Sequence, residues 1–185
     1  SNSEMESWLK QIRSIAAKEK KVRVLAGSEV DILPNGDLDY PDDLLKKMDV
    51  VVGSIHSRFR LTREEMTKRI LKAMDNKHLD ILGHPTGRRI GKREPIEFDV
   101  KKVFSAAAER KVLLEINAHP ERSDLNDVLA REARRYGCKF VIDTDSHSTE
   151  NLKFMDLGVA IARRAWLSPD DVVNTRPLRA LPKFF

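Results

Sequence analysis

FVIDTDSH, residues 140–147, is the stretch of sequence from which the fold is predicted. It begins with three apolar residues, as a buried strand does, and it contains two acids and ends with a histidine. Because side chains two apart on a strand point the same way, Asp143, Asp145 and His147 are expected to face one side together. Carboxylate oxygens and an imidazole nitrogen arranged in this way can bind a divalent cation. A lone Asp-x-His pair is more often a polar turn, so the prediction depends on what the other strands carry.

Short apolar runs alternate with amphipathic stretches along all 185 residues. The predicted strands cover residues 22–26, 49–55, 79–83, 112–117 and 139–145. The predicted helices cover residues 3–20, 41–48, 62–76, 98–110 and 124–136, with further helices after Ser148 and from Ser168. Ser3 with Glu6, and Thr62 with Glu65, have the capping-box spacing of helix starts. Alternation at about 25–30 residues per unit predicts an α/β fold, a mainly parallel sheet with outer helices, in a single domain over residues 1–185.

Every predicted strand ends near side chains that can bind metal or move a proton. These are Glu29, His56, His84, Glu115 with Asn117, and Asp145 with His147. In parallel α/β folds the carboxyl ends of the strands meet at the active face, so the side chains are expected to converge there. Oxygen and imidazole ligands without thiolate favour Zn²⁺, Mn²⁺ or Fe²⁺ over a sulfur-ligated site.

The other histidines and the single cysteine are interpreted as structural. His78 is expected at the surface, His119 in a loop, and Cys138 as a buried thiol at the opposite end of the sheet from the site. One cysteine allows no intrachain disulfide, which favours a reducing, cytoplasmic location. No apolar run approaches the ~20 residues of a membrane span, so no membrane association is expected.

Basic residues follow two of the histidines. Arg58 and Arg60 come after His56, and a run with two glycines, residues 87–93, comes after His84. Loop arginines beside a metal cluster can hold phosphate through paired hydrogen bonds, so Arg58, Arg88 and Arg89 are predicted to bind a phosphate ester. Residues 88–93 are expected to line the site and to be mobile without substrate. The net charge of +5 permits a polyanionic partner but does not require one.

The chain resembles the PHP (polymerase and histidinol phosphatase) metallophosphoesterases, most of all the PHP domain of bacterial and archaeal family X DNA polymerases. Five segments carry the resemblance: GSEVDILPNGDLDYP at 27–41, VVGSIHSRF at 51–59, DILGHPTGR at 80–88, LLEINAHPERSDL at 113–125 and DTDSHS at 143–148. They occur in order and cover nearly the whole chain.

This resemblance implies a distorted (β/α)7 barrel that holds up to three metal ions through about nine ligands. Five of those ligands match by position, namely Glu29, His56, His84, Asp145 and His147. From their strand positions, Asp31, Glu115 and Asp143 are expected to act beside the ligands as catalytic groups. The family implies Mn²⁺, Zn²⁺ or Fe²⁺ as cofactor, DNA as substrate, and polymerase domains in the same protein. The expected activity is 3′–5′ exonuclease or end-processing chemistry in DNA repair.

The family's first two strands have no counterpart in these 185 residues. They carry an HxH, a later Asp and a further His, so four ligands are expected to be missing and the chain alone to be nearly inactive. Loss of two barrel strands is also expected to expose strand edges. We therefore expect either an edge-paired oligomer or cover by the first helix, through an apolar stripe of Met5, Trp8, Leu9, Ile12 and Ile15.

Two other functions fit the same residues. The chain could be a catalytically incomplete PHP domain that supports a polymerase structurally. It could also be a free-standing small-molecule phosphatase of the histidinol phosphatase type. Metal content and a phosphodiester assay on the full-length protein separate the structural domain from a DNA phosphoesterase. The missing HxH weighs against the free-standing phosphatase, because such enzymes need it too.

Overall fold

Five parallel strands pair in chain order, β1-β2-β3-β4-β5, in the computed structural model, which describes residues 1–181. The strands are β1 (Gly27–Asp31), β2 (Val50–Ser54), β3 (Ile81–Leu82), β4 (Leu113–Asn117) and β5 (Phe140–Asp143). The predicted α/β class and parallel sheet are therefore confirmed. Within residues 1–181, β1 and β5 are the two outer strands of the sheet, and a closed seven-stranded barrel stays a prediction.

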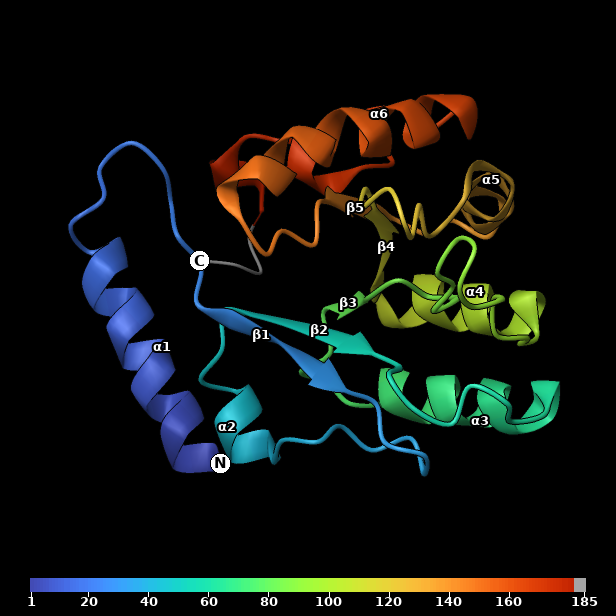
Figure 1. Ribbon diagram of the computed structural model, residues 1–185, viewed down its shortest axis with the longest axis horizontal. Coiled ribbons are helices and arrows are strands. Elements are labelled where there is room, and N and C mark those ends of the chain that lie inside the picture. The colour runs from blue at the N-terminus through green and yellow to red at the C-terminus, as the bar shows by residue number, and fades with distance from the viewer. Residues whose placement is uncertain (182–185) are drawn as a thin grey trace.

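Helices α3 to α6 follow one another along the outside of the sheet in chain order (Figure 1). The helices are α1 (Asn2–Ala16), α2 (Asp42–Leu45), α3 (Arg63–Met74), α4 (Val100–Arg110), α5 (Asp127–Arg135) and α6 (Met155–Arg164). Short 3₁₀ helices cover Thr149–Phe154, Val173–Thr175 and Leu178–Ala180. Among residues 1–181, none of the helices is long and apolar enough to cross a membrane.

Two local predictions about helices are wrong. The capping box of α1 joins Ser1 and Glu4, not Ser3 and Glu6. Glu6 instead lies 2.7 Å from Lys47 Nζ, so its carboxylate serves a tertiary contact. No α-helix starts at Ser168, because Asp171 accepts hydrogen bonds from the Ser168 N–H and hydroxyl and holds the segment in a turn. The capping box of Thr62 and Glu65 at the start of α3 is confirmed.

The first predicted strand is displaced along the chain. Residues 22–26 form no strand, and pairing with β2 begins only at Gly27, opposite Val50. A Cβ on Gly27 would lie 2.2 Å from the Val50 carbonyl oxygen, so the absence of a side chain permits this close start. Glu29 therefore lies inside β1, not beyond its end.

The main core lies between the sheet and the helices α3 to α6. Its fully buried side chains include Met66, Ile70, Phe104, Leu114, Ile116 and Phe140. Helix α1 belongs to a small second cluster in which Leu9 packs with Ala26 and Leu44. Trp8 and Ile15 are 59% and 67% exposed, so the predicted apolar stripe of α1 packs only in part.

Candidate metal centre

Three ligand side chains converge at the carboxyl ends of neighbouring strands. Glu29 lies in β1, His56 lies two residues after β2, and His84 lies two residues after β3. One ligand atom from each lies within 4.8 Å of the others. Glu29 Oε1 is 2.9 Å from His84 Nε2 and 3.5 Å from His56 Nε2. The predicted convergence is therefore seen for these three residues.

The imidazole of His84 has the surroundings expected of a metal ligand. Its side chain is 1% exposed, and neither ring nitrogen makes a hydrogen bond, although Nε2 contacts Glu29. A buried polar group without a partner is costly, so the ring fits a site completed by an ion. The backbone φ of His84 is +25°, an unusual value for a residue with a side chain, and its N–H donates to the Glu115 carboxylate. The sharp turn and this hydrogen bond hold the residue in place.

Asp31 sets the orientation of His56. Its Oδ1 lies 2.5 Å from His56 Nδ1, which leaves Nε2 directed toward Glu29. A carboxylate on the far nitrogen of a histidine ligand fixes its tautomer and ring plane. The pKa of His56 is raised, mainly by Glu29 against the opposing effect of burial, with a further contribution from Asp31. Burial alone would raise the pKa of Glu29, but the contacts with His56 and His84 lower it well below its usual range.

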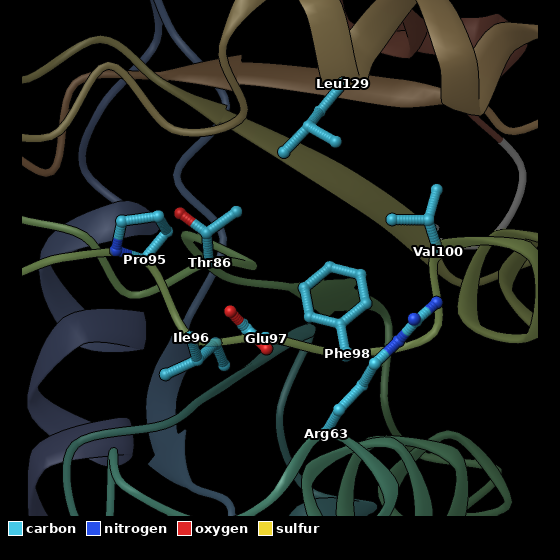
Figure 2. Close-up of a pocket in the computed structure, with 8 residues that line it drawn as sticks. All are labelled: Arg63, Thr86, Pro95, Ile96, Glu97, Phe98, Val100 and Leu129. Carbon is cyan, nitrogen blue, oxygen red and sulfur yellow. The ribbon is translucent and has the colours of Figure 1, made fainter.

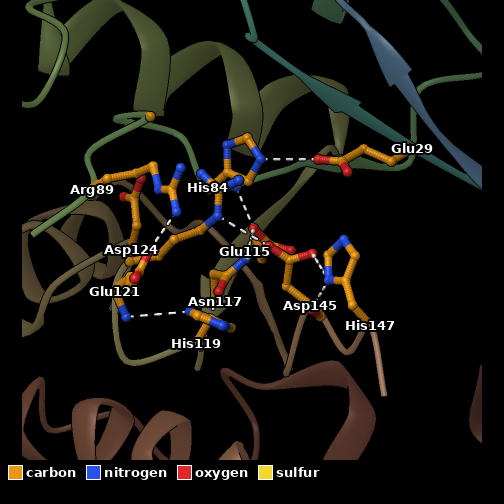
Figure 3. A network of polar contacts seen from close by, with 12 residues as sticks. Glu29, His84, Arg89, Glu115, Asn117, His119, Glu121, Asp124, Asp145 and His147 are labelled. Carbon is orange, nitrogen blue, oxygen red and sulfur yellow. Dashed lines mark hydrogen bonds and ion pairs between the residues drawn. The ribbon is translucent and has the colours of Figure 1, made fainter. Parts of the chain in front are cut away.

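Asp145 and His147 lie beside this group and are connected to it by polar contacts (Figure 3). Asp145 Oδ2 accepts from Asn117 Nδ2 at 3.2 Å and from Arg122 Nε at 3.0 Å. Asn117 Nδ2 also lies 3.3 Å from Glu115 Oε2, the oxygen that accepts from His84 N–H. The His147 side chain is 82% exposed, and its Nδ1 is 2.8 Å from the Asp145 carbonyl oxygen. These two predicted ligands thus share the face but fall outside the compact group of three.

Glu115, which is buried, and Asp143, which is half-buried, form a pair of acids behind His84. Burial raises the pKa of Glu115 well above its usual range, and the neighbouring Asp143 raises it further. Burial likewise raises the pKa of Asp143, whose Oδ1 has no hydrogen-bond partner. Two adjacent carboxyls with little solvent around them cannot both ionise cheaply. Glu115 supports His84 directly, because its carboxylate accepts from His84 N–H.

The predicted phosphate-binding arginines differ in their surroundings. Arg88 donates from Nε to the Arg122 carbonyl at 2.7 Å and from Nη2 to the Ser123 carbonyl, so it braces a loop. Arg89 pairs with Glu121. Arg58 is exposed, and among the described residues no ion pair holds its guanidinium. Only Arg58 is therefore fully available to a ligand.

Two residues that support the candidate site were not predicted from the sequence. Arg122 forms an ion pair with Asp145 in which both side chains are 17% exposed. Asp124 is completely buried and accepts from Thr86 N–H, so it holds the chain just after His84. Both residues lie in the LLEINAHPERSDL segment. Nothing in their spacing indicates these contacts, since each depends on a loop folding back across the sheet.

A pocket of about 300 Å³ adjoins the second part of the site. It is lined by Arg89, His119, Glu121, Arg122, Asp145 and His147. His119, predicted to be a loop residue, lies in this wall, and its Nδ1 accepts from Glu121 N–H. Lys92 and Arg89 together lower the pKa of Glu121 to about 2. The pocket thus combines two candidate metal ligands with paired cations.

A different pocket, of about 380 Å³, lies between the loop after His84 and the starts of α3, α4 and α5 (Figure 2). Its walls are largely apolar, with Ile96, Phe98, Val100 and Leu129, and its charged side chains are Arg63 and Glu97. No histidine lines it. The ligand set of Glu29, His56 and His84 is thus a stronger candidate for the functional site.

Comparisons with known proteins agree with this site. No family model matches the sequence. The chain is 42% identical over 175 residues, 95% of its length, to the DNA polymerase/3′-5′ exonuclease PolX of Bacillus subtilis, of which it spans only 31%. It is 32% identical to a "Probable phosphatase" of Thermoanaerobacter sp. (strain X514), covering 89% of this chain and 69% of that protein. It is 38% identical to a "Probable phosphatase" of Clostridium acetobutylicum over 68% of this chain and 53% of that one. These relatives show that the chain belongs to the PHP family of polymerase-associated domains and phosphatases.

Proposed function

We propose that the chain is the metal-dependent phosphoesterase domain of a family X DNA polymerase, acting on phosphodiester or phosphate ends of DNA. The observation that carries the proposal is the group of Glu29, His56 and His84, in which the buried imidazole of His84 directs Nε2 to the Glu29 carboxylate at 2.9 Å and has no hydrogen-bond partner for Nδ1. The Bacillus subtilis relative, named a polymerase and 3′-5′ exonuclease, supports DNA as the substrate class. End processing of this kind fits DNA repair, and the polymerase domains would be part of the same intact protein.

Glu29, His56 and His84 would hold the metal, and Asp145 and His147 would add ligands from the adjoining pocket. A divalent ion such as Mn²⁺, Zn²⁺ or Fe²⁺ supplies a nucleophilic hydroxide at neutral pH and stabilises charge on phosphate oxygens. Asp31 keeps Nε2 of His56 facing the ligand group, and Arg122 keeps Asp145 in position. Glu115 fixes the His84 backbone by accepting a hydrogen bond from its N–H, and Asp143 lies beside Glu115.

Arginines position the substrate in this proposal. Arg58 has an exposed guanidinium close to His56 in the chain, which suits it to a phosphate oxygen. Arg89 lines the same pocket as Asp145 and His147, and a phosphate could replace Glu121 as its partner. Arg88 braces the loop after β4 through the carbonyls of Arg122 and Ser123.

Metal binding and hydrolysis test the proposal separately. Titration calorimetry of the chain with Mn²⁺ and Zn²⁺ should show binding that His84→Ala abolishes. The intact protein should release nucleotides or phosphate from DNA ends with Mn²⁺, and His84→Ala should remove this activity. Full metal binding and hydrolysis in His84→Ala would contradict the proposed site. If the 185-residue chain alone matched the intact protein in turnover, the expectation that it lacks ligands would be wrong.

The two phosphatase relatives favour small phosphate monoesters as a second candidate substrate class. The pocket beside Asp145 is about 300 Å³, which is large enough for such a molecule. Comparing kcat/KM for p-nitrophenyl phosphate and for a DNA end decides between them. A catalytically incomplete, structural domain predicts no metal-dependent turnover of either substrate by the intact protein.

A further inference from the structure

Residues 88–93 form a braced hairpin at the edge of the candidate site. Arg89 N–H donates to the Arg93 carbonyl at 2.9 Å and Arg93 N–H donates back to the Arg89 carbonyl at 2.8 Å. Glu121 pairs with Arg89 and Lys92, while Arg93 lies 3.7 Å over the Phe59 ring and donates to the Gly87 carbonyl. Both arms of the hairpin are thus held by contacts, and the expected mobility of this segment without substrate stays a prediction.

The hairpin stands between two depressions of different character. One arm contributes Arg89 to the pocket of about 300 Å³ that contains Asp145 and His147. The other arm contributes Lys92 and Arg93 to a groove of about 720 Å³ that also holds Arg58 and Arg60. The groove has four cationic side chains against the single acid Glu94, so it suits a run of phosphates.

The tip of the hairpin presents an apolar side chain to solvent. Ile90 is 54% exposed, and its backbone is fixed because Ile90 N–H donates to the Glu121 carbonyl at 2.7 Å. Gly91 beside it has φ of +73° and no atoms within 4 Å of a built Cβ, so the space around the tip is open. Proteins that unstack DNA place apolar side chains of this kind between successive bases, next to cations that hold the backbone.

We propose that Ile90 is a wedge that separates the last nucleotide of a DNA strand from its neighbour. The backbone lies in the groove of Arg58 and Arg60, the hairpin tip enters the step between the last two bases, and the terminal nucleotide passes into the pocket of Asp145 and His147. This inference rests on the proposed action on DNA ends. It assigns the hairpin a positioning role that makes a paired end accessible to the site.

The test places 2-aminopurine as the 3′-terminal base of a blunt DNA duplex, because its fluorescence rises when the base unstacks. The intact protein is titrated in Ca²⁺ in place of Mn²⁺, binding is followed by anisotropy, and the duplex is checked for cleavage afterwards. We expect a fluorescence rise with wild type, and loss of most of that rise with Ile90→Ala. The dissociation constant should stay within about tenfold, since the cationic contacts remain. Val22→Ala is the matched control, because Val22 is 64% exposed and precedes β1, at the opposite end of the strand from the site.

Hydrolysis gives an independent readout. With Mn²⁺, Ile90→Ala should cut duplex ends more slowly than wild type but cut single strands at the wild-type rate. An equal fluorescence rise in Ile90→Ala and wild type would overturn the wedge. An equal decrease in the rate of hydrolysis of duplex and single-stranded DNA by Ile90→Ala would also overturn it. Absence of DNA binding by wild type would also overturn it. Absence of hydrolysis with the fluorescence change intact would count against the proposed function and leave the wedge supported.

Discussion

The contact between Asp31 and His56 shows how a single carboxylate prepares a metal ligand. With Oδ1 at 2.5 Å from Nδ1, Asp31 leaves only Nε2 of His56 free to face Glu29. Without that contact the ring can rotate or take the other tautomer, and either change removes a ligand atom from the group. Asp31 is thus a positioning residue for the proposed site.

We expect Asp31→Ala to weaken Mn²⁺ or Zn²⁺ binding about 10–100-fold, the usual cost of losing the carboxylate behind a histidine ligand. Titration calorimetry of the chain measures this change. Asp39→Ala is the control, because Asp39 is exposed and lies in the same acidic segment. Equal affinities for wild type and Asp31→Ala would mean that His56 is oriented by other contacts.

Cys138 gives a pH-dependent prediction. Burial raises the pKa of its thiol to about 12, and Sγ donates to the Phe104 carbonyl at 3.2 Å. The folded pKa lies above the unfolded value of about 8.5. The free energy of unfolding that the buried thiol contributes is therefore fully present below about pH 8.5 and is lost as the pH rises toward 12. From pH 8 to 10 this loss is at most about 2 kcal/mol. Urea unfolding of the wild type should show this decrease in the free energy of unfolding. In Cys138→Ala the free energy of unfolding should fall less over the same pH range, by that amount.

For single residues, the sequence predicted which side chains lie at the site better than it predicted which residues they contact. The acids and histidines that end the strands follow from the α/β pattern, because parallel strands bring their carboxyl ends together. Arg122 and Asp124 could not be identified in this way, since their contacts with Asp145 and Thr86 depend on the path of the loop after β4. Arg88 was predicted to bind phosphate, but its hydrogen bonds to two carbonyls appear only in the folded chain.

At the scale of the elements, Gly158 lets α6 pack closely against the sheet. A Cβ there would lie 2.4 Å from Ile142 Cγ2 and 2.9 Å from Ala118 Cβ. Both neighbours belong to packed structure, Ile142 being in β5, so they cannot move aside without disturbing the core. The helix is placed by the absence of a side chain at this position.

Gly158→Ala should therefore destabilise the protein, although alanine favours helix by about 1 kcal/mol. Overpacking costs about 1–3 kcal/mol, so we expect a net loss that thermal or urea unfolding can detect. Ala160→Gly is the matched control, because Ala160 is exposed on the same helix. Its substitution measures the difference in helix propensity between alanine and glycine without a change in packing. A more stable Gly158→Ala protein would show that α6 can shift outward at little cost.

The displaced start of β1 illustrates what element prediction lacks. Residues 22–26 are as apolar as a strand, yet Val22 is 64% exposed and only Ala26 among them is buried, against α1 and α2. Strand pairing is decided by the partner: Asp49 N–H donates to the Ala26 carbonyl, and the register with β2 runs from Gly27, opposite Val50, onward. A sequence pattern cannot supply that register.

In the whole molecule, the free backbone edges of the two outer strands, β1 and β5, are covered to different extents. The free edge of β5 is covered by residues 171–174, where Phe140 N–H donates to the Asp171 carbonyl at 2.9 Å. The Asn174 side chain then takes the place of a further strand, accepting from Ile142 N–H at 3.1 Å and donating to the Ile142 carbonyl at 2.7 Å. On β1, Asp39 N–H donates to the Asp31 carbonyl and shields only the end of the strand. The expected exposure of strand edges thus applies mainly to β1.

Asn174→Ala should both weaken the fold and promote self-association. It leaves the N–H and carbonyl of Ile142 without their partners, a loss of about 1–3 kcal/mol, and it opens a strand edge that a second chain can pair with. Asn76→Ala is the matched control, since Asn76 also makes two side-chain hydrogen bonds, to Asp42 and to His78 N–H, but borders no sheet edge. Sedimentation velocity over a range of concentrations should show more dimer for Asn174→Ala than for wild type or Asn76→Ala, with comparable loss of stability in both variants. If the two variants associated equally, the association would follow from lower stability and not from the freed edge of β5.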